Sequence, residues 1–366
     1  MQTGGTSIWD QILSLLFLVI FTIYFFTDIP QRLQFYRYSR AAATRLAMLE
    51  SLVNESVAKV QNYLSRLGVE NAYAIVKRFL ENYFVIEPVD KEPIDIIRRL
   101  DHVIRTSEEK AKKDLENILP GLGRDARNNV AVALAISSAL YSVYKTLRHY
   151  YIVGRKYENW ILLMQLAVIL PQIVKELSAY VKAIDDIVRG VPIGDSVGPL
   201  VAYKLARLAQ RVEVVEDTVV SIVEFEGRKI YVIKARGPGA TVGKPGKALA
   251  KIAEELGCNI ARIITVDAAL KLEGESSGEV FEGSGAAIGD IGPEKIEIER
   301  IAVKCRAPLD AVIIKMSSQE AIRGITKELA EAVEKAYQRV VEIIRSRTRV
   351  GDTVVVIGVG NTVGVY

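Results

Sequence analysis

The spacing of apolar residues divides the chain into three stretches. Ile8–Phe26 is an almost unbroken apolar run of 19 residues, which is long enough for a helix to cross a bilayer. From residue 41 to 189, apolar residues recur every three or four positions, the period of amphipathic helices. From residue 190 onward, short runs rich in Val and Ile alternate with helical patterns. The sequence therefore predicts a transmembrane anchor at 8–26, an all-α domain at 41–189 and an α/β domain at 190–366.

Charges beside the 8–26 segment predict its orientation. No Lys or Arg precedes it, whereas Arg32, Arg37, Arg40 and Arg45 follow it closely, and positive flanks stay on the cytoplasmic side. We expect a single-pass protein of the cell membrane, with its N-terminus outside and the bulk of the chain in the cytoplasm. A cleaved signal peptide is the alternative, but such a peptide carries a positive region before its apolar core.

Two further apolar stretches, 130–144 and 160–174, are 15 residues each. Both are short for a spanning helix and are flanked by charge, and Pro171 interrupts the second. We therefore expect buried helices here, while a protein with several spans stays open as the alternative.

Five continuous apolar runs predict the strands of the C-terminal domain: 219–225, 230–234, 260–266, 311–314 and 353–359. Helices are expected between them at 247–256 and 319–345, the second preceded by a capping box of Ser317 and Glu320. Continuous rather than alternating runs indicate a mostly parallel sheet covered by helices on both faces, of the phosphorylase/hydrolase-like type. The last strand is expected to be central.

Charge and cysteine content narrow the chemistry. A net charge of +4 over 366 residues gives no argument for a nucleic-acid partner. Cys258 and Cys305 form no CxxC pair, and the only histidines are His102 and His149, so no zinc-site spacing exists. We expect two reduced thiols in the core, no metal site and no cofactor.

Polar residues at predicted strand and helix ends are the candidates for a site, because open α/β sheets bind ligands there. Asp195 precedes a helix start and Asp267 ends an apolar strand. Each is either a structural cap or a carboxylate of the site. Asn361 follows the last strand and is placed to bond a substrate amide or to orient a neighbouring carboxylate.

The glycine-rich segment 236–247 invites a phosphate-binding interpretation, since backbone amides before a helix hold anions. Arg236, Gly239, Lys244 and Lys247 are the candidate anion ligands. The segment is not a Walker A motif, because its glycine spacing differs and a proline follows the lysine. An ordinary glycine-rich connection is the alternative.

Taken together, these segments resemble the fold shared by hydrogenase-maturation endopeptidases and the spore germination protease. Those proteins combine a Gly-x-Gly-Asn strand end, a Gly-Asp-x-x-Gly-Pro helix start and an Ile-Asp-Ala strand end before a glycine-rich loop. The corresponding segments here are Gly358-Val-Gly-Asn361, Gly194-Asp-Ser-Val-Gly-Pro199 and Val266-Asp-Ala268, with Gly283 and Gly285 in the matching loop. The Gly-Asn strand comes last here instead of first, which implies a circular permutation.

This resemblance covers residues 190–366 and implies an aspartate-dependent peptidase or related hydrolase. By motif, Asp195 and Asp267 are its catalytic carboxyl groups, one acting as base toward water and the other as acid. The histidine-containing nickel site of the hydrogenase peptidases is not available, because both histidines precede this domain. The whole chain also resembles an archaeal family of membrane proteins of unknown function.

Three functions remain open on the sequence alone. The first is a membrane-anchored peptidase or hydrolase, and the second is a non-catalytic module that binds a peptide or protein partner at the bilayer. The third is nucleotide or phosphate binding through 236–247. The separation of the Asp195 and Asp267 carboxyl groups discriminates the first from the second.

Overall fold

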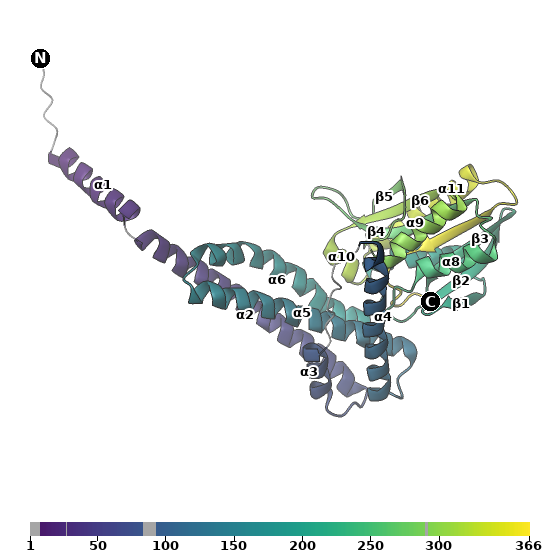
Figure 1. The fold of residues 1–366 in the computed structure, drawn as a ribbon, viewed down its shortest axis with the longest axis horizontal. Coiled ribbons are helices and arrows are strands. Elements are labelled where there is room, and N and C mark those ends of the chain that lie inside the picture. Colours follow the sequence, from purple (N-terminus) through teal and green to yellow (C-terminus); the bar gives the residue numbers. More distant parts are fainter. Residues whose placement is uncertain (1–7, 27, 83–92, 290–291) are drawn as a thin grey trace, which may run out of the picture. The chain divides into compact units, whose positions relative to one another are not determined.

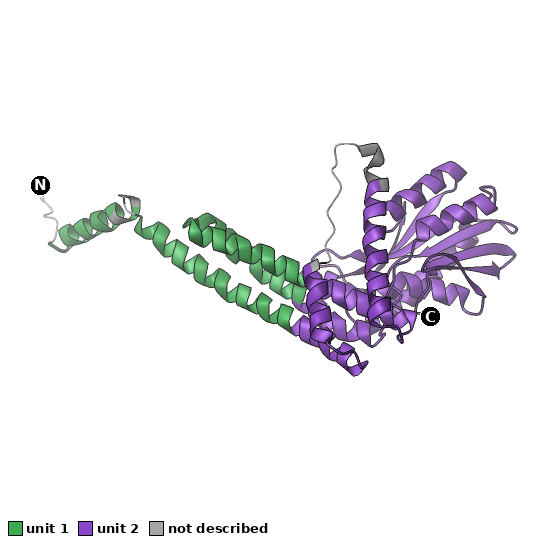
Figure 2. Ribbon diagram, turned by 60° about the horizontal axis from the view of Figure 1, so that its bottom comes forward, with its two compact units in different colours: residues 1–54, 140–177 green, residues 55–139, 178–366 purple. Residues whose placement is uncertain are grey.

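A computed structural model describes residues 8–26, 28–82, 93–289 and 292–366 (Figure 1). The chain forms two compact units (Figure 2). Unit 1 comprises residues 1–54 and 140–177, and unit 2 comprises residues 55–139 and 178–366. Unit 2 therefore holds helices that precede residue 190 together with the α/β part.

The N-terminal half of the chain is all helical. Its helices, among the described residues, are α1 (Ile8–Phe26), α2 (Ile29–Arg66), α3 (Ala72–Asn82), α4 (Pro93–Ile118), α5 (Arg124–Lys156) and α6 (Trp160–Val188). Unit 1 is held together where α2, α5 and α6 pack, with Ala42 and Leu46 of α2 buried against Leu147, Leu166 and Leu170. The predicted all-α character of this part is confirmed.

Three helices bear on membrane association. By length and composition, α5 and α6 could each cross a membrane, and about a third or less of their apolar windows is buried in the protein. In α1, by contrast, the large apolar side chains are 45% to 75% exposed, among them Trp9 and Phe21. An apolar surface of this extent needs cover from lipid or protein.

The C-terminal part is an α/β domain around one seven-stranded sheet in the order β1-β2-β3-β7-β4-β6-β5. Its strands are β1 (Arg211–Val215), β2 (Thr218–Phe225), β3 (Arg228–Ala235), β4 (Arg262–Leu270), β5 (Val280–Ser284), β6 (Leu309–Met316) and β7 (Thr353–Gly358). The sheet is mixed, so the expectation of a mostly parallel sheet is wrong. Strands β3, β7, β4 and β6 pair in parallel, but the three outer pairings are antiparallel.

Helices cover both faces of the sheet. They are α7 (Val197–Ala206), α8 (Pro245–Glu255), α9 (Pro293–Cys305), α10 (Ser318–Ile322) and α11 (Lys327–Arg347), preceded by a 3-10 turn, η1 (Gly194–Ser196). One face packs on α7 and α11, and the other on α8 and α9. All five predicted strands exist, and β7 is central as expected. The sequence pattern did not predict the two short outer strands, β1 and β5. Each is held by hydrogen bonds to its neighbouring strand, β2 or β6.

The predicted helix at 319–345 is in fact two helices, which corrects that expectation. Ser317 and Glu320 form the predicted capping box at the start of α10. The chain then turns extended at Arg323, and a new helix begins with Thr326 as its N-cap. The break is fixed by a partner remote in sequence, because the backbone N–H of Gly324 donates to Asp186 at 3.0 Å.

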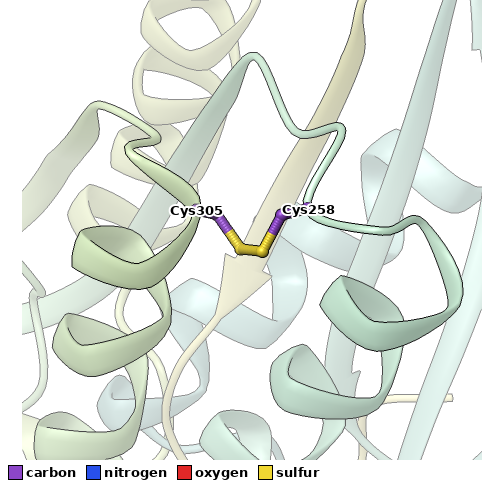
Figure 3. Close-up of a disulfide and its surroundings, with 2 residues drawn as sticks. All are labelled: Cys258 and Cys305. Atoms are coloured by element: carbon purple, nitrogen blue, oxygen red, sulfur yellow. A yellow bond between two sulfur atoms is a disulfide. The ribbon is translucent and has the colours of Figure 1, made fainter.

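The cysteines are also corrected. Cys258 and Cys305 form a disulfide across 47 residues instead of lying as separate reduced thiols (Figure 3). Cys258 lies in the loop after α8, and Cys305 is the last residue of α9. The bond therefore joins the C-terminal ends of the two helices that cover one face of the sheet.

Replacing both cysteines by serine is expected to lower the free energy of unfolding by about 4 kcal/mol. The reason is the loop entropy that a cross-link over 47 residues removes from the unfolded chain. Urea unfolding of C258S/C305S and of the oxidised wild type measures the difference. The two proteins should unfold alike in excess dithiothreitol. A wild type with the same stability with and without reductant would show that the bond contributes nothing.

Candidate functional site

The carboxyl ends of the two central strands meet the start of α7. The N–H of Val359, just after β7, donates to the carbonyl of Val266 in β4 at 2.9 Å. The turn η1, which leads into α7, lies at the same edge and contacts β4. The C-terminal strand therefore lies beside the 192–200 turn, and segments that are 70 to 165 residues apart share one edge of the sheet.

Glycines make this approach possible. A Cβ at Gly198 would lie 2.2 Å from the carbonyl oxygen of Val359 and 2.4 Å from that of Val266. Gly360 has a φ of +126°, and a Cβ there would meet the carbonyl of Asp195 at 2.0 Å. Helix α7 thus packs on bare backbone, which only glycine allows.

Asp195 lies in η1 and points to the end of β7. Its Oδ2 accepts a hydrogen bond from the backbone N–H of Asn361 at 2.7 Å. Burial raises the pKa of Asp195, and the bond from Asn361 offsets part of that rise. The N-cap of α7 is Ser196, so Asp195 does not cap this helix. The Asn361 side chain accepts from Val363, so it is the backbone of Asn361 that contacts the carboxylate.

Asp267 lies near the end of β4 and is only 4% exposed. Burial raises its pKa well above the usual value, and the negative charge of Asp195 raises it further. Hydrogen bonds from the N–H groups of Ala268, at 2.7 Å, and of Gly289 act in the opposite direction. Because η1, which carries Asp195, contacts β4, which carries Asp267, the two carboxyl groups lie at the same strand ends.

Burial raises the pKa of both carboxyl groups, and the charge of Asp195 raises that of Asp267 further. Two close carboxyl groups can share a proton, one acting as acid and the other as base. The residues that the structure describes contain no group of three or more His, Cys, Asp or Glu side chains able to hold a metal ion.

The glycine-rich loop after β5 covers the carboxyl ends of the central strands. The N–H of Ala287 donates to Thr265 of β4 at 2.8 Å, and Gly289 bonds Asp267. Gly283 lies within β5, and Gly285 follows it with a φ of +113°. Neither of these two predicted residues contacts the acidic pair, whereas Gly289, which the sequence analysis did not single out, does.

The candidate anion ligands at 236–247 are paired with carboxylates. Lys244 bonds Glu216 at 2.7 Å, and Lys247 bonds both carboxylate oxygens of Asp101 at 3.0 and 3.1 Å. Hydrogen bonds from Lys112 and then Lys244 lower the pKa of Glu216 to about 2. These cations therefore neutralise acidic side chains of the protein itself.

The N-terminus of α8, in the same segment, is also bound by a carboxylate of the protein itself. Glu294 of α9 accepts from the N–H groups of Gly246 and Lys247 at 2.6 and 3.3 Å. Arg236 lies 3.5 Å from Glu213, and Gly239 packs against the backbone of Asp125 in α5. The carboxylate of Glu294 takes the place that a bound anion would have at the N-terminus of α8.

Lys234 is a buried cation that the sequence analysis missed. It lies near the end of β3, opposite Gly358 of β7, and is 3% exposed. Its Nζ donates to the carbonyls of Ala235 and Arg236 at 3.0 and 3.2 Å. Burial, aided by the charge of Arg211, lowers the pKa of Lys234 to about 8. A lysine directly after four apolar residues, 230–233, was the signal available in the sequence.

Two family models match the chain. A family model described as "Protein of unknown function (DUF1512) N-terminal domain" matches residues 16–190. A second, "Domain of unknown function (DUF1512) C-terminal", matches residues 193–366. The chain belongs to the DUF1512 family. No curated protein matches the sequence of this DUF1512 chain.

Asp267→Asn is expected to gain stability relative to the wild type as the pH rises from 4 to 8. Because its pKa is raised, the folded state binds more protons than the unfolded state, and wild-type stability falls as pH rises through this range. Urea unfolding at several pH values measures the difference. Asp186→Asn is the control. Hydrogen bonds from Gly324 and Arg323 outweigh burial and lower the pKa of Asp186. The stability that Asp186→Asn loses relative to the wild type should therefore be constant above pH 4.5. Parallel pH profiles for both variants would contradict the raised pKa of Asp267.

Lys234→Met is expected to remove a gain of about 3 kcal/mol that wild-type stability shows between pH 8 and 10.5. In this interval the unfolded lysine binds a proton that the folded one, with a pKa of about 8, has lost, so stability rises with pH. Unfolding curves at pH 7.5 and 10.5 measure this slope. Lys229→Met, at an exposed position of the same strand, should keep the wild-type slope. A K234M slope equal to that of wild type would show that Lys234 is not the group responsible.

Proposed function

We propose that this protein is a membrane-attached hydrolase that cleaves peptide bonds with the pair Asp195 and Asp267. The observation that supports the proposal is the placement of two buried carboxyl groups, Asp195 in η1 and Asp267 in β4, at the carboxyl ends of central strands. Ligands of open α/β sheets bind at such strand ends. The sequence resemblance to peptidases assigns catalysis to the same two residues.

Each carboxyl group has a distinct part in the proposed reaction. Asp195, whose charged form is stabilised by the N–H of Asn361, takes a proton from water as the water oxygen bonds to the carbonyl carbon. Asp267, whose pKa is raised by burial and by Asp195, gives its proton to the leaving nitrogen as the C–N bond breaks. Transfer of a proton from Asp195 to Asp267 restores the starting state, and the products are a carboxylic acid and an amine.

Attachment to the membrane is proposed through α1 as a single pass, with the N-terminus outside. The exposed apolar surface of α1 and the arginines that follow it support this orientation. The Cys258–Cys305 disulfide points the other way, because disulfides are rare in cytosolic proteins outside hyperthermophiles. Labelling of Cys258 and Cys305 in intact cells after mild reduction, with a reagent that does not cross membranes, decides between the two sides.

One observation favours a second function, a non-catalytic module that binds peptides at the membrane. Asp195 and Asp267 both accept hydrogen bonds from backbone N–H groups, of Asn361 and of Ala268 and Gly289. Such bonds hold loops in place whether or not water is activated. A binding module would need the same geometry without turnover.

Asp195→Asn and Asp267→Asn should each reduce the rate of peptide cleavage by about 100-fold or more, since each removes a proton-transfer group. Full-length protein in detergent is incubated with a mixed peptide library, and new N-termini are counted by mass spectrometry. Asp352→Asn, which alters another aspartate that accepts a backbone N–H, should cleave at the wild-type rate. Peptides that are retained but not cut by the wild type would establish the binding module. If peptides are neither cut nor retained, both functions are rejected.

A further inference from the structure

One end of unit 1 gathers basic residues. We define the basic end as residues 29–40 at the start of α2 together with residues 145–160 around the turn from α5 to α6. These segments hold seven Lys or Arg residues and one acidic residue, Glu158. Their net charge of +6 exceeds that of the whole chain, which is +4. The remaining residues together are therefore slightly acidic, and positive charge is concentrated in this place.

Contacts within unit 1 bring the two segments of the basic end side by side. The hydroxyl groups of Ser39 and Tyr151 lie 3.4 Å apart. A second contact pairs an earlier residue of α5 with a later residue of α2, because Tyr144 bonds Glu50. The helices are therefore antiparallel; the helices of unit 1 are green in Figure 2. Arg155, one turn beyond Tyr151, is consequently level with about residue 35 of α2.

This level is close to the end of the proposed membrane anchor. Helix α2 begins at Ile29, three residues after α1 ends at Phe26. At 1.5 Å per residue, Arg155 and Lys156 lie roughly 10 Å along the helix axis from the start of α2. That distance is comparable to the Debye length of about 8 Å at physiological salt, so headgroup charge at the exit of α1 would act on both residues.

Aromatic and apolar side chains accompany the charges. Tyr150 and Tyr157 are 47% and 68% exposed, and Ile152 and Ile161 are also exposed. The ammonium group of Lys156 lies over the ring of Tyr157. Tyrosine and tryptophan beside lysine and arginine form the usual composition of protein surfaces at a bilayer interface.

We propose that the basic end binds the anionic headgroups of the membrane face at which α1 leaves the bilayer. The inference rests on the proposed insertion of α1 and adds a second, electrostatic contact. Juxtamembrane basic clusters of this kind bind anionic lipid in a salt-dependent manner. The contact would hold the α2, α5 and α6 bundle against the surface instead of leaving it to swing on one helix.

The two tryptophans of the chain report the two contacts separately. Trp9 lies in α1, and Trp160 begins α6 at the basic end. W9F and W160F proteins are reconstituted in vesicles of phosphatidylcholine with or without 30% phosphatidylglycerol. In each, dibromo-phosphatidylcholine, brominated near the headgroup, quenches the remaining tryptophan if it lies in the interface. The percentage of anionic lipid is an experimental setting of roughly the charge density at which basic clusters bind.

We expect Trp160 in W9F to be quenched in anionic vesicles, and the quenching to fall by about half or more in 0.5 M salt or in neutral vesicles. R148Q/R155Q/K156Q should reduce it similarly. The control K304Q/K327Q/R349Q removes three charges from exposed positions of the α/β domain and should leave it unchanged.

Failure of this proposal is distinct from failure of the anchor. Quenching of Trp9 without quenching of Trp160 in any vesicle would overturn the headgroup contact and leave α1 inserted. Quenching of Trp160 that is independent of lipid charge and salt would also overturn it, because the α5–α6 turn would then enter the bilayer as an apolar hairpin. If Trp9 is not quenched, the proposed anchor itself is wrong.

Discussion

The direct packing of α7 on the backbones of β4 and β7 is the constraint on which the candidate site depends. Side chains normally hold a helix away from the backbone of a sheet, but Gly198 removes that spacing at one point, where any Cβ would lie 2.2 and 2.4 Å from two carbonyl oxygens. The η1 turn therefore lies directly against the strand ends. Asp195 reaches the N–H of Asn361 and the neighbourhood of Asp267 for this reason. A larger residue at 198 would separate the two carboxyl groups.

The C-terminal tail transmits this packing to the helical part of unit 2. Thr362 and Gly364 donate N–H bonds to Thr241 and Pro238, at 2.9 and 2.8 Å. The same loop is held from the other side, where the N–H of Ala240 donates to Asn129 of α5 at 2.8 Å. The 236–247 segment is thus a structural bridge between the strand that carries Asn361 and the helices before residue 190. Its glycines serve close contacts with protein backbone.

Local patterns predicted what local interactions determine. The strand runs, the Ser317–Glu320 capping box and the central position of β7 were all readable, since apolar periodicity and adjacent side chains decide them. Pairing between residues that are far apart in the sequence was not predictable from such patterns. Lys247 bonds Asp101, which is 146 residues away in the sequence, and Glu294, which is 47 residues away. The segment whose pattern predicts an anion site is therefore neutralised by carboxylates of the same chain. The disulfide and the break at Arg323 were missed for the same reason, and the acidic pair was found only because short motifs happened to mark both residues.

Burial of ionisable groups argues that the strand ends are kept for chemistry. Asp267 is buried where both desolvation and Asp195 oppose its charge, and Lys234 is buried without a carboxylate partner among the described residues. Each arrangement lowers stability, and apolar residues of similar size would be more stable at both positions. Other buried charges of the sheet have polar partners: Asp310 pairs with Arg262 and Arg347, and Arg228 bonds Thr348. Buried ionisable groups without an oppositely charged partner, at the carboxyl ends of strands, are the pattern expected where function and stability conflict.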